Sequence, residues 1–219
     1  MSRKVMTALF AGLLLASTAS ADVLWDRSSF DAFGAGFFNV DAGGPPFGIT
    51  MYTVHHVVVG GGGWTIDSIT LYYSALDPAW GTGIANGTLH VFDKTGPLPI
   101  DGTDDPTASP IVAMSGTLDA DHWVVTASGL DLALAPGEYW IGITPIAGAG
   151  PFGPEIHLAS LDPPSGDDSA SYDPFAFPGP PAWLNFNPGY EASILIEGTE
   201  EGPVSVEASS FGGVKALYR

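Results

Sequence analysis

Apolar residues at every second position recur along the chain in short segments, and this alternation limits its folds more than any other feature. The clearest segments are residues 69–73, 87–93, 137–146 and 193–197. Such alternation places the apolar side chains of a strand on one face. Clusters of Gly, Pro, Asp and Ser, which favour turns, separate the segments. The pattern therefore predicts many short strands joined by turns.

Weaker alternation adds further strands at residues 36–40, 49–59, 111–117, 121–127, 130–134 and 155–161. No window of eleven residues keeps the helical spacing of apolar residues without a Gly or Pro interruption, so a parallel α/β fold is not expected. Four consecutive glycines at residues 60–63 suit a sharp corner between two sheets. We expect an all-β fold, an antiparallel two-sheet β-sandwich with jelly-roll-like topology.

The first 21 residues have the pattern of a signal peptide. Arg3 and Lys4 precede an apolar run at residues 5–16, and Ala-Ser-Ala at residues 19–21 fits a cleavage site. The run is shorter than the roughly 20 residues that a membrane span needs. We therefore expect export, cleavage before Asp22 and no transmembrane segment.

The charge of the chain is strongly acidic. The chain from Asp22 onward holds four basic and 24 acidic residues, hence a formal charge of −20. Binding to nucleic acid or to an anionic membrane surface is therefore not expected. The chain has no cysteine, which excludes disulfides, cysteine-ligated metals and a thiol nucleophile. Because secreted eukaryotic domains are often disulfide-bonded, a bacterial exported protein is favoured, extracellular or at the cell surface, with the periplasm as the alternative.

Residues 134–143, Leu-Ala-Pro-Gly-Glu-Tyr-Trp-Ile-Gly-Ile, resemble the Leu-x-Pro-Gly-x-Tyr-Trp strand corner of exported bacterial β-sandwich modules. The resemblance extends as a pattern over residues 36–197. It implies a jelly-roll or related sandwich and no particular activity, because that fold serves many functions.

The last nine residues, Phe-Gly-Gly-Val-Lys-Ala-Leu-Tyr-Arg, resemble a short tail of exported bacterial proteins, with Phe211 where that tail usually has Trp. The resemblance implies sorting or surface-attachment machinery as a partner. In a helix, Val214, Leu217 and Tyr218 would share one face, and so short a helix would order only against a partner. We expect a signal peptide at 1–21, a sandwich domain at 22–197, an acidic linker at 198–210 and a tail at 211–219.

Catalytic motifs are missing from the sequence. His55 and His56 are adjacent, so they would point to opposite faces of a strand, and there is no His-Glu-x-x-His or Gly-x-Ser-x-Gly motif. We do not predict an enzyme. The alternative is a secreted polysaccharide hydrolase with paired carboxylates.

Calcium is the candidate cofactor, because it prefers several oxygen ligands from Asp-rich loops. The candidate ligands are Asp101, Asp104, Asp105, Asp162, Asp167 and Asp168. The alternative is an acidic loop that is merely solvated.

Aromatic residues in Gly/Pro-rich segments are candidates for stacking on a sugar ring. The candidate ligand-binding residues are Trp80, Tyr172, Trp183, Asn185, Asn187 and Tyr190. The alternative is that the loop buries its own rings in a satellite cluster.

These features predict an exported, non-catalytic surface or matrix protein with a glycan or matrix ligand as candidate partner. The alternatives are the hydrolase and a structural envelope subunit. A hydrolase should have a cleft with two converging carboxylates, one of raised pKa. A glycan-binding module should have a shallow aromatic platform, and a structural subunit an exposed strand edge.

Overall fold

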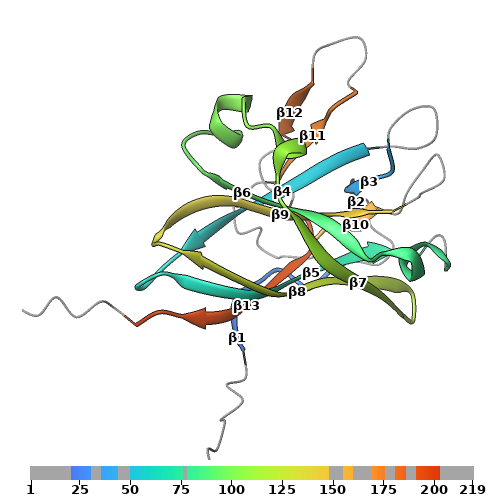
Figure 1. The fold of residues 1–219 in the computed structure, drawn as a ribbon, viewed down its shortest axis with the longest axis horizontal. Helices are drawn as coiled ribbons and strands as arrows, with labels where there is room; N and C mark the ends of the chain where they lie inside the picture. Colours follow the sequence, from blue (N-terminus) through green and yellow to red (C-terminus); the bar gives the residue numbers. More distant parts are fainter. Residues whose placement is uncertain are drawn as a thin grey trace, which may run out of the picture.

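The computed structural model describes residues 21–30, 36–43, 50–75, 78–147, 155–159, 169–175, 181–185 and 191–202, without the side chains of Asp101 and Asn185. Strands dominate these ranges (Figure 1), together with three short 3-10 turns, η1 (Trp80–Gly83), η2 (Pro99–Gly102) and η3 (Pro106–Ala108). The all-β prediction is confirmed. Residues 1–20 of the expected signal peptide (1–21) and the whole of the expected tail (211–219) lie outside the described residues.

One group of strands lies side by side and antiparallel in the order β1 (Asp22–Asp26), β13 (Ile194–Glu200), β5 (Trp64–Ser74) and β8 (His122–Leu134). Off this path, β10 (Glu155–His157) pairs with both β5 and β2 (Gly36–Phe38).

A second group contains β6 (Asn86–Asp93), β9 (Gly137–Ile146), β4 (Thr50–Val59), β11 (Ser169–Asp173) and β12 (Ala182–Asn185). β3 (Val40–Asp41) pairs with β4 and also with β9, at Asp41 and Ile146. That last pairing is parallel, so the sheet is mixed and not purely antiparallel as predicted.

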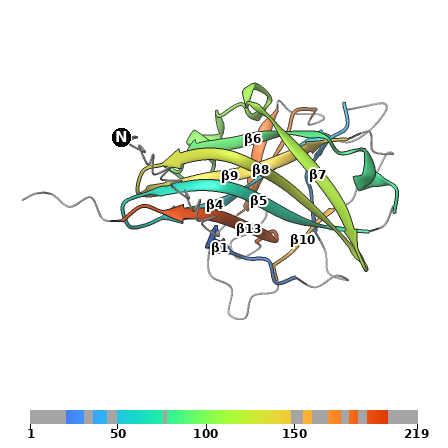
Figure 2. The same ribbon diagram turned by 60° about the horizontal axis from the view of Figure 1, so that its bottom comes forward.

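The strand β7 (Ile111–Asp119) joins the two groups. Its residues 111–113 pair with β6, and its residues 114–119 pair with β8. Figure 2 shows β7 running obliquely from β6 to β8. Apart from β2 and β10, the strands thus form one continuous path that passes from the first group to the second within β7.

Alternate side chains from both groups meet in one apolar core. Ile69 and Leu71 of β5 and Val125 of β8 belong to the same buried cluster as Ile141 and Ile143 of β9. Each is fully buried, which stabilises the fold by roughly 1.5–3 kcal/mol per large aliphatic side chain relative to exposure. The period-2 pattern of the sequence therefore marks the core-facing positions correctly.

The glycines at residues 60–63 form the predicted corner, connecting β4 of the second group to β5 of the first. Gly61 and Gly63 have φ angles of 59° and 114°, which residues with a Cβ rarely adopt. A Cβ added at Gly63 would also lie 2.4 Å from the Leu134 carbonyl oxygen. Gly61 and Gly63 are therefore required by the backbone of this corner.

The last strand extends past the expected domain boundary at residue 197. β13 continues to Glu200, because after an irregularity at Gly198 its residues pair again with β5, ending with Glu200 opposite Trp64. The strand thus takes the first three residues of the expected linker. No helix among the described residues has the length and apolar character needed to cross a bilayer.

Candidate functional site

The strand β7 pairs with only part of each of its neighbours. On β6 its pairing ends at Thr88, and on β8 it ends at Ala127. Residues 128–134 of β8 are paired with β5 on one edge and have no strand on the other among the described residues. An open space therefore separates the last halves of β6 and β8, in line with the track of β7.

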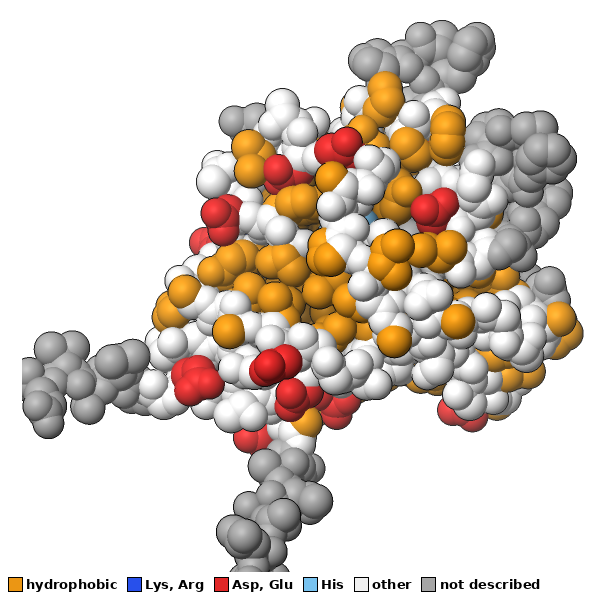
Figure 3. All heavy atoms as spheres, viewed as in Figure 1, with side chains coloured by type: hydrophobic (Ala, Val, Ile, Leu, Met, Phe, Trp, Pro, Cys, Tyr) orange, Lys and Arg blue, Asp and Glu red, His pale blue; other side chains and the backbone are white. Residues whose placement is uncertain are grey.

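This space, which we call the β6–β8 slot, is a groove of about 340 Å³. Its lining residues are Leu89, Val91 and Phe92 of β6, Leu132 of β8, and Asp105, Ala108, Ser109 and Pro110 from the segment before β7. Figure 3 shows apolar side chains gathered in a hollow on this side of the molecule. The slot is therefore mainly apolar, with one carboxylate among its lining side chains.

The segment before β7 leaves the slot open on its β6 side. Pro110 immediately precedes β7, and its carbonyl oxygen accepts a hydrogen bond from the Leu89 N–H at 2.9 Å. Before Pro110 the chain turns into η3, where the Asp105 carboxylate accepts hydrogen bonds from the Thr107 N–H and hydroxyl at 2.9 and 2.6 Å. This capped turn takes the chain away from the β7 track. Proline without an N–H is suited to a strand end.

The other side of the slot is formed by an irregular stretch of β8. Gly129 and Asp131 have positive φ angles of 69° and 48°, and the register to β5 shifts between Ile66 and Ser68. The extra residues of this bulge bend the strand. Leu130, Leu132 and Leu134 pack against the core and remain partly exposed, because no strand of the described part of the chain covers that side.

His90 of β6 forms a hydrogen bond with the segment before β7. Its Nδ1 lies 2.9 Å from the Ser109 hydroxyl and its Nε2 lies 3.0 Å from the Thr144 hydroxyl. The Thr144 hydroxyl donates onward to the Asn39 side-chain oxygen at 2.6 Å, which assigns the proton of the imidazole to Nε2. Burial lowers the pKa of His90 to about 3, so the ring is neutral near pH 7.

The predicted sugar-binding residues do not form one exposed platform. Trp80 is 6 % exposed and packs in the core, with its ring centroid 5.0 Å from that of Tyr73. Trp183 is 3 % exposed, and its Nε1 donates a hydrogen bond to the Asp104 carbonyl oxygen at 2.7 Å. The expected exposure of both rings is therefore wrong, because the segments that carry them fold back onto neighbouring aromatic rings.

Tyr172 is partly exposed, unlike Trp80 and Trp183. Its ring centroid lies 5.3 Å from that of Trp183, and burial together with the charge of Asp105 raises the pKa of its hydroxyl. Trp183 and Tyr172 pack with Phe92 in a second, smaller cluster, as the satellite-cluster alternative predicts. Asn185 lies in β12 opposite Ala170, while Asn187 and Tyr190 lie outside the described residues.

The candidate calcium ligands are not brought together where the structure describes them. Asp105 caps η3, and Asp101 lies in η2. No group of three or more His, Asp or Glu side chains within the described ranges is placed to hold a metal ion. Asp162, Asp167 and Asp168 lie outside those ranges, and calcium binding stays a prediction.

Asp104 is the carboxyl group closest to the description of a catalytic acid. Burial, and secondarily the charge of Asp93, raises its pKa. Its Oδ2 is buried and has no hydrogen-bond partner among the described residues. Neither Asp104 nor Asp93 lines the slot, so this pair does not face the groove.

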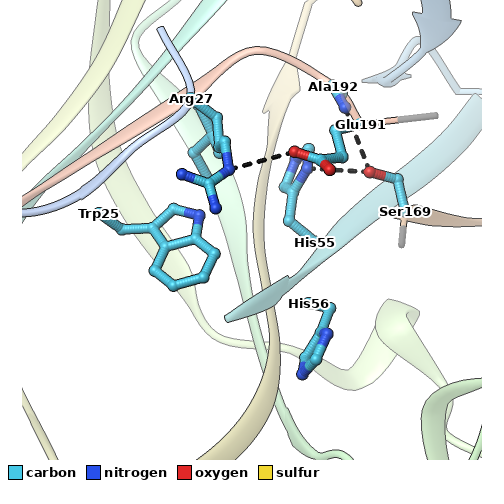
Figure 4. A pocket seen from close by; sticks show the side chains of 8 residues that line it. Trp25, Arg27, His55, His56, Ser169, Glu191 and Ala192 are labelled. Atoms are coloured by element: carbon cyan, nitrogen blue, oxygen red, sulfur yellow. Dashed lines mark hydrogen bonds and ion pairs between the residues drawn. The ribbon is translucent and has the colours of Figure 1, made fainter. Parts of the chain in front are cut away.

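A serine and a histidine also meet beside a small space that Trp25 and Arg27 help to line (Figure 4). The Ser169 hydroxyl lies 3.2 Å from His55 Nδ1 and accepts a hydrogen bond from the Ala192 N–H, while Glu191 pairs with Arg27 at 3.1 Å. Ser169 and His55 are 1 % and 3 % exposed, and the adjoining space of about 10 Å³ is roughly that of one water molecule. Burial lowers the pKa of His55 to about 3. These contacts connect β4, β11 and the segment before β13. The space beside them is too small for a substrate.

Comparisons of this chain with protein-family models, with curated proteins and with solved structures find no match. The function is therefore argued from the geometry of the slot. Of the slot residues, only Asp105 was a candidate at the level of sequence, and it was a candidate as a calcium ligand and not as part of a groove. The sequence does contain one signal for the slot. The leucines at 130, 132 and 134 continue the apolar alternation of β8 beyond the residues that pair with the shorter strand β7.

Proposed function

We propose that this protein is an exported, non-catalytic surface or matrix component that holds an extended peptide segment in the β6–β8 slot. The observation that carries the proposal is the open edge of β8 at residues 128–134, which faces β6 across an apolar groove. An open strand edge is the feature expected of a structural subunit. Export and surface location are supported by the N-terminal segment alone.

The chemistry of such a slot suits a peptide better than other ligands. An added strand forms main-chain hydrogen bonds with an open edge, and its alternate side chains enter the pockets beside that edge. Leu89, Val91 and Leu132 offer an apolar surface for those side chains. At its far end the slot leads into β7, which itself pairs with both β6 and β8. A bound strand would therefore extend the sheet path along a track that β7 already follows.

The other candidate functions have less support from the described residues. Glycan binding would need exposed rings, and of the described candidates only Tyr172 offers a partly exposed one. A hydrolase would need its acids beside the groove, whereas the raised pKa belongs to Asp104, whose Oδ2 is buried. Both therefore rank below peptide binding.

A peptide-display experiment tests the proposal. The chain ending at Gly202 keeps every strand and the whole described core, and it would be panned against random twelve-residue peptides. We expect peptides with alternating apolar residues. Their affinity should fall at least tenfold in Ala108→Arg, which places a long charged side chain at the slot wall.

The matched control is Ala85→Arg, which makes the same change at another exposed alanine, outside the slot lining. It should leave peptide affinity unchanged. The proposal is wrong if no peptide is selected, or if Ala108→Arg and Ala85→Arg bind the selected peptides equally well.

A further inference from the structure

We infer that the occupant of the β6–β8 slot is the C-terminal segment of the same molecule, residues 203–219, docked as an added strand. The inference rests on the proposed function, because it takes the slot to be an acceptor for an extended peptide. It adds the identity of that peptide. The arguments are the place where the described chain ends, its direction, its reach and its charge.

The described chain ends near the end of the slot that lies beside Leu134 of β8. Glu200 lies opposite Trp64, and Trp64 lies opposite Leu134, the last residue of β8. Two backbone hydrogen bonds fix the exit, from the Glu201 N–H to the Gly63 carbonyl oxygen at 2.8 Å and from the Gly62 N–H to the Glu201 carbonyl oxygen at 3.1 Å. With neighbouring strands about 4.8 Å apart, the track beside β8 is roughly 15 Å from β13.

The segment is long enough to cross that distance and fill the slot. At about 3.3 Å per residue, residues 203–210 span up to about 26 Å. The nine residues from Phe211 onward then span about 30 Å, whereas residues 128–134 of β8 extend over roughly 20 Å. The linker therefore reaches the slot with length to spare.

The direction of entry also fits. β5 begins at the end of the sheet where β8 finishes, because Trp64 pairs with Leu134. A segment entering there and running toward Ile111 would travel in the direction of β7, which is antiparallel to both β6 and β8. The docked strand would thus run antiparallel to both β6 and β8, as β7 does where residues 111–113 pair with β6 and residues 114–119 pair with β8.

The side chains of the segment match the slot in polarity. In an extended conformation Val214, Ala216 and Tyr218 share one face, and Lys215, Leu217 and Arg219 lie on the other. The apolar face suits the lining of the slot. A helix would use a different apolar face, but nine residues are too few for a stable isolated helix, so the segment is available for strand pairing.

Charge complementarity supports the same arrangement. Residues 22–202 hold two basic and 23 acidic residues, whereas residues 203–219 hold two basic residues and one acidic residue. Asp105 in the slot and Asp131 in the open stretch of β8 are exposed carboxylates. The outward face with Lys215 and Arg219 would lie among them.

Disulfide trapping tests the inference in the full chain, which has no native cysteine to interfere. One variant combines Ala216→Cys in the segment with Ala108→Cys in the slot wall. The matched control combines Ala216→Cys with Val23→Cys, which is 58 % exposed on the edge strand β1 and separated from β8 by β13 and β5. Under mild oxidation at micromolar concentration, we expect the first pair to close within one molecule at least tenfold faster than the control pair.

A second pair gives the conformation of the docked segment. Replacing Ala216→Cys by Leu217→Cys moves the thiol to the opposite face of a strand, so trapping to Ala108→Cys should fall several-fold. Equal trapping at the two positions would contradict strand docking.

The remaining outcomes separate the inference from the proposed function. Trapping no faster than the control would overturn the inference. Disulfides that form only between molecules, at a rate that rises with protein concentration, would overturn it in favour of a second copy as the occupant. In either case peptides selected by the slot would leave the proposed function standing, while failure of the peptide selection as well would remove both.

Discussion

Ala113 and Met114 are consecutive residues of β7 with partners in different groups of strands: Ala113 pairs with Asn86 of β6, and Met114 pairs with Ala127 of β8. Because β7 changes partners here, it fills the space between β6 and β8 from Ile111 onward and leaves that space open before Ile111. Before Ile111 the track between β6 and β8 is unoccupied by any described strand, and it forms the slot. The functional proposal therefore depends on the place where β7 changes partners.

Gly87 should be required at this switch. A Cβ at Gly87 would lie 2.0 Å from the Met114 sulfur and 2.6 Å from the Thr144 carbonyl oxygen, and the latter is backbone that cannot move aside. We expect Gly87→Ala to lower the free energy of unfolding by about 1–3 kcal/mol. Urea denaturation measures this loss.

The matched control is Gly83→Ala, because no atom lies within 4 Å of a Cβ at Gly83. It should change stability by no more than about 0.5 kcal/mol. If the two variants are equally stable, the packing described at the switch is wrong.

Acid should destabilise the fold through His90. Its pKa is about 3 in the folded chain and about 6.5 in an unfolded one, so the neutral ring favours folding above pH 6.5 and this contribution is lost as the pH falls toward 3. Below pH 6 the free energy of unfolding should lose about 1.4 kcal/mol per pH unit for this group. His55 should contribute in the same direction.

His90→Gln removes one of these protonations. Between pH 6 and 5 its stability should fall less steeply than that of the parent chain, by about 1.4 kcal/mol per pH unit, while the two slopes should coincide between pH 7.5 and 8.5. Denaturant titrations across this range give both slopes. Identical slopes from pH 6 to 5 would contradict the buried neutral state of His90.

Trp183 should be a structural residue. Trp183→Phe keeps most of the ring volume and loses the hydrogen bond to the Asp104 carbonyl, so we expect a loss of about 1 kcal/mol. Trp183→Ala also empties a buried site and should cost about 3–5 kcal/mol. Leu184→Ala, at a neighbouring position that is 47 % exposed, should change stability by less than about 0.5 kcal/mol. A Trp183→Ala variant as stable as Leu184→Ala would show that the ring is not packed as described.

Calcium remains to be tested at the acidic segments. If the Asp101–Asp105 region or the acidic residues 162–168 bind the ion, stability should rise by about 2.7 kcal/mol at a hundredfold excess of calcium over its dissociation constant. EDTA should then lower the melting temperature. A melting temperature unchanged by both calcium and EDTA leaves the solvated-loop alternative.

The sequence predicts those strands whose burial follows from their own composition. Residues 137–146 coincide with β9, and the alternation at residues 69–73 lies within β5. β11 escaped prediction because its buried residues include Ala170 and Ser171, which are small and are covered through pairing with β4 and β12. The edge strand β1 is similar: its two ends are exposed, and pairing with β13 defines it.

The slot and the place of Trp80 depend on tertiary contacts that no local pattern contains. Trp80 lies in a glycine-rich segment that folds onto Trp123, 6.4 Å away between ring centroids, and Gly81 permits this contact because a Cβ there would collide with the Trp123 ring. The partner switch in β7 leaves the alternation of that strand unchanged. Periodicity therefore predicts the strand but not the edge that it leaves open.

Backbone hydrogen exchange along β8 tests the central claim most directly. The full chain and the chain ending at Gly202 would be compared at residues 122–134, with residues 122–127 as the internal reference because they pair with β7 on one side and β5 on the other. If the C-terminal segment docks in the slot, amides at residues 128–134 that are not bonded to β5 should exchange at least tenfold more slowly in the full chain, while residues 122–127 exchange alike in both. Equal exchange at residues 128–134 in the two chains would contradict the account.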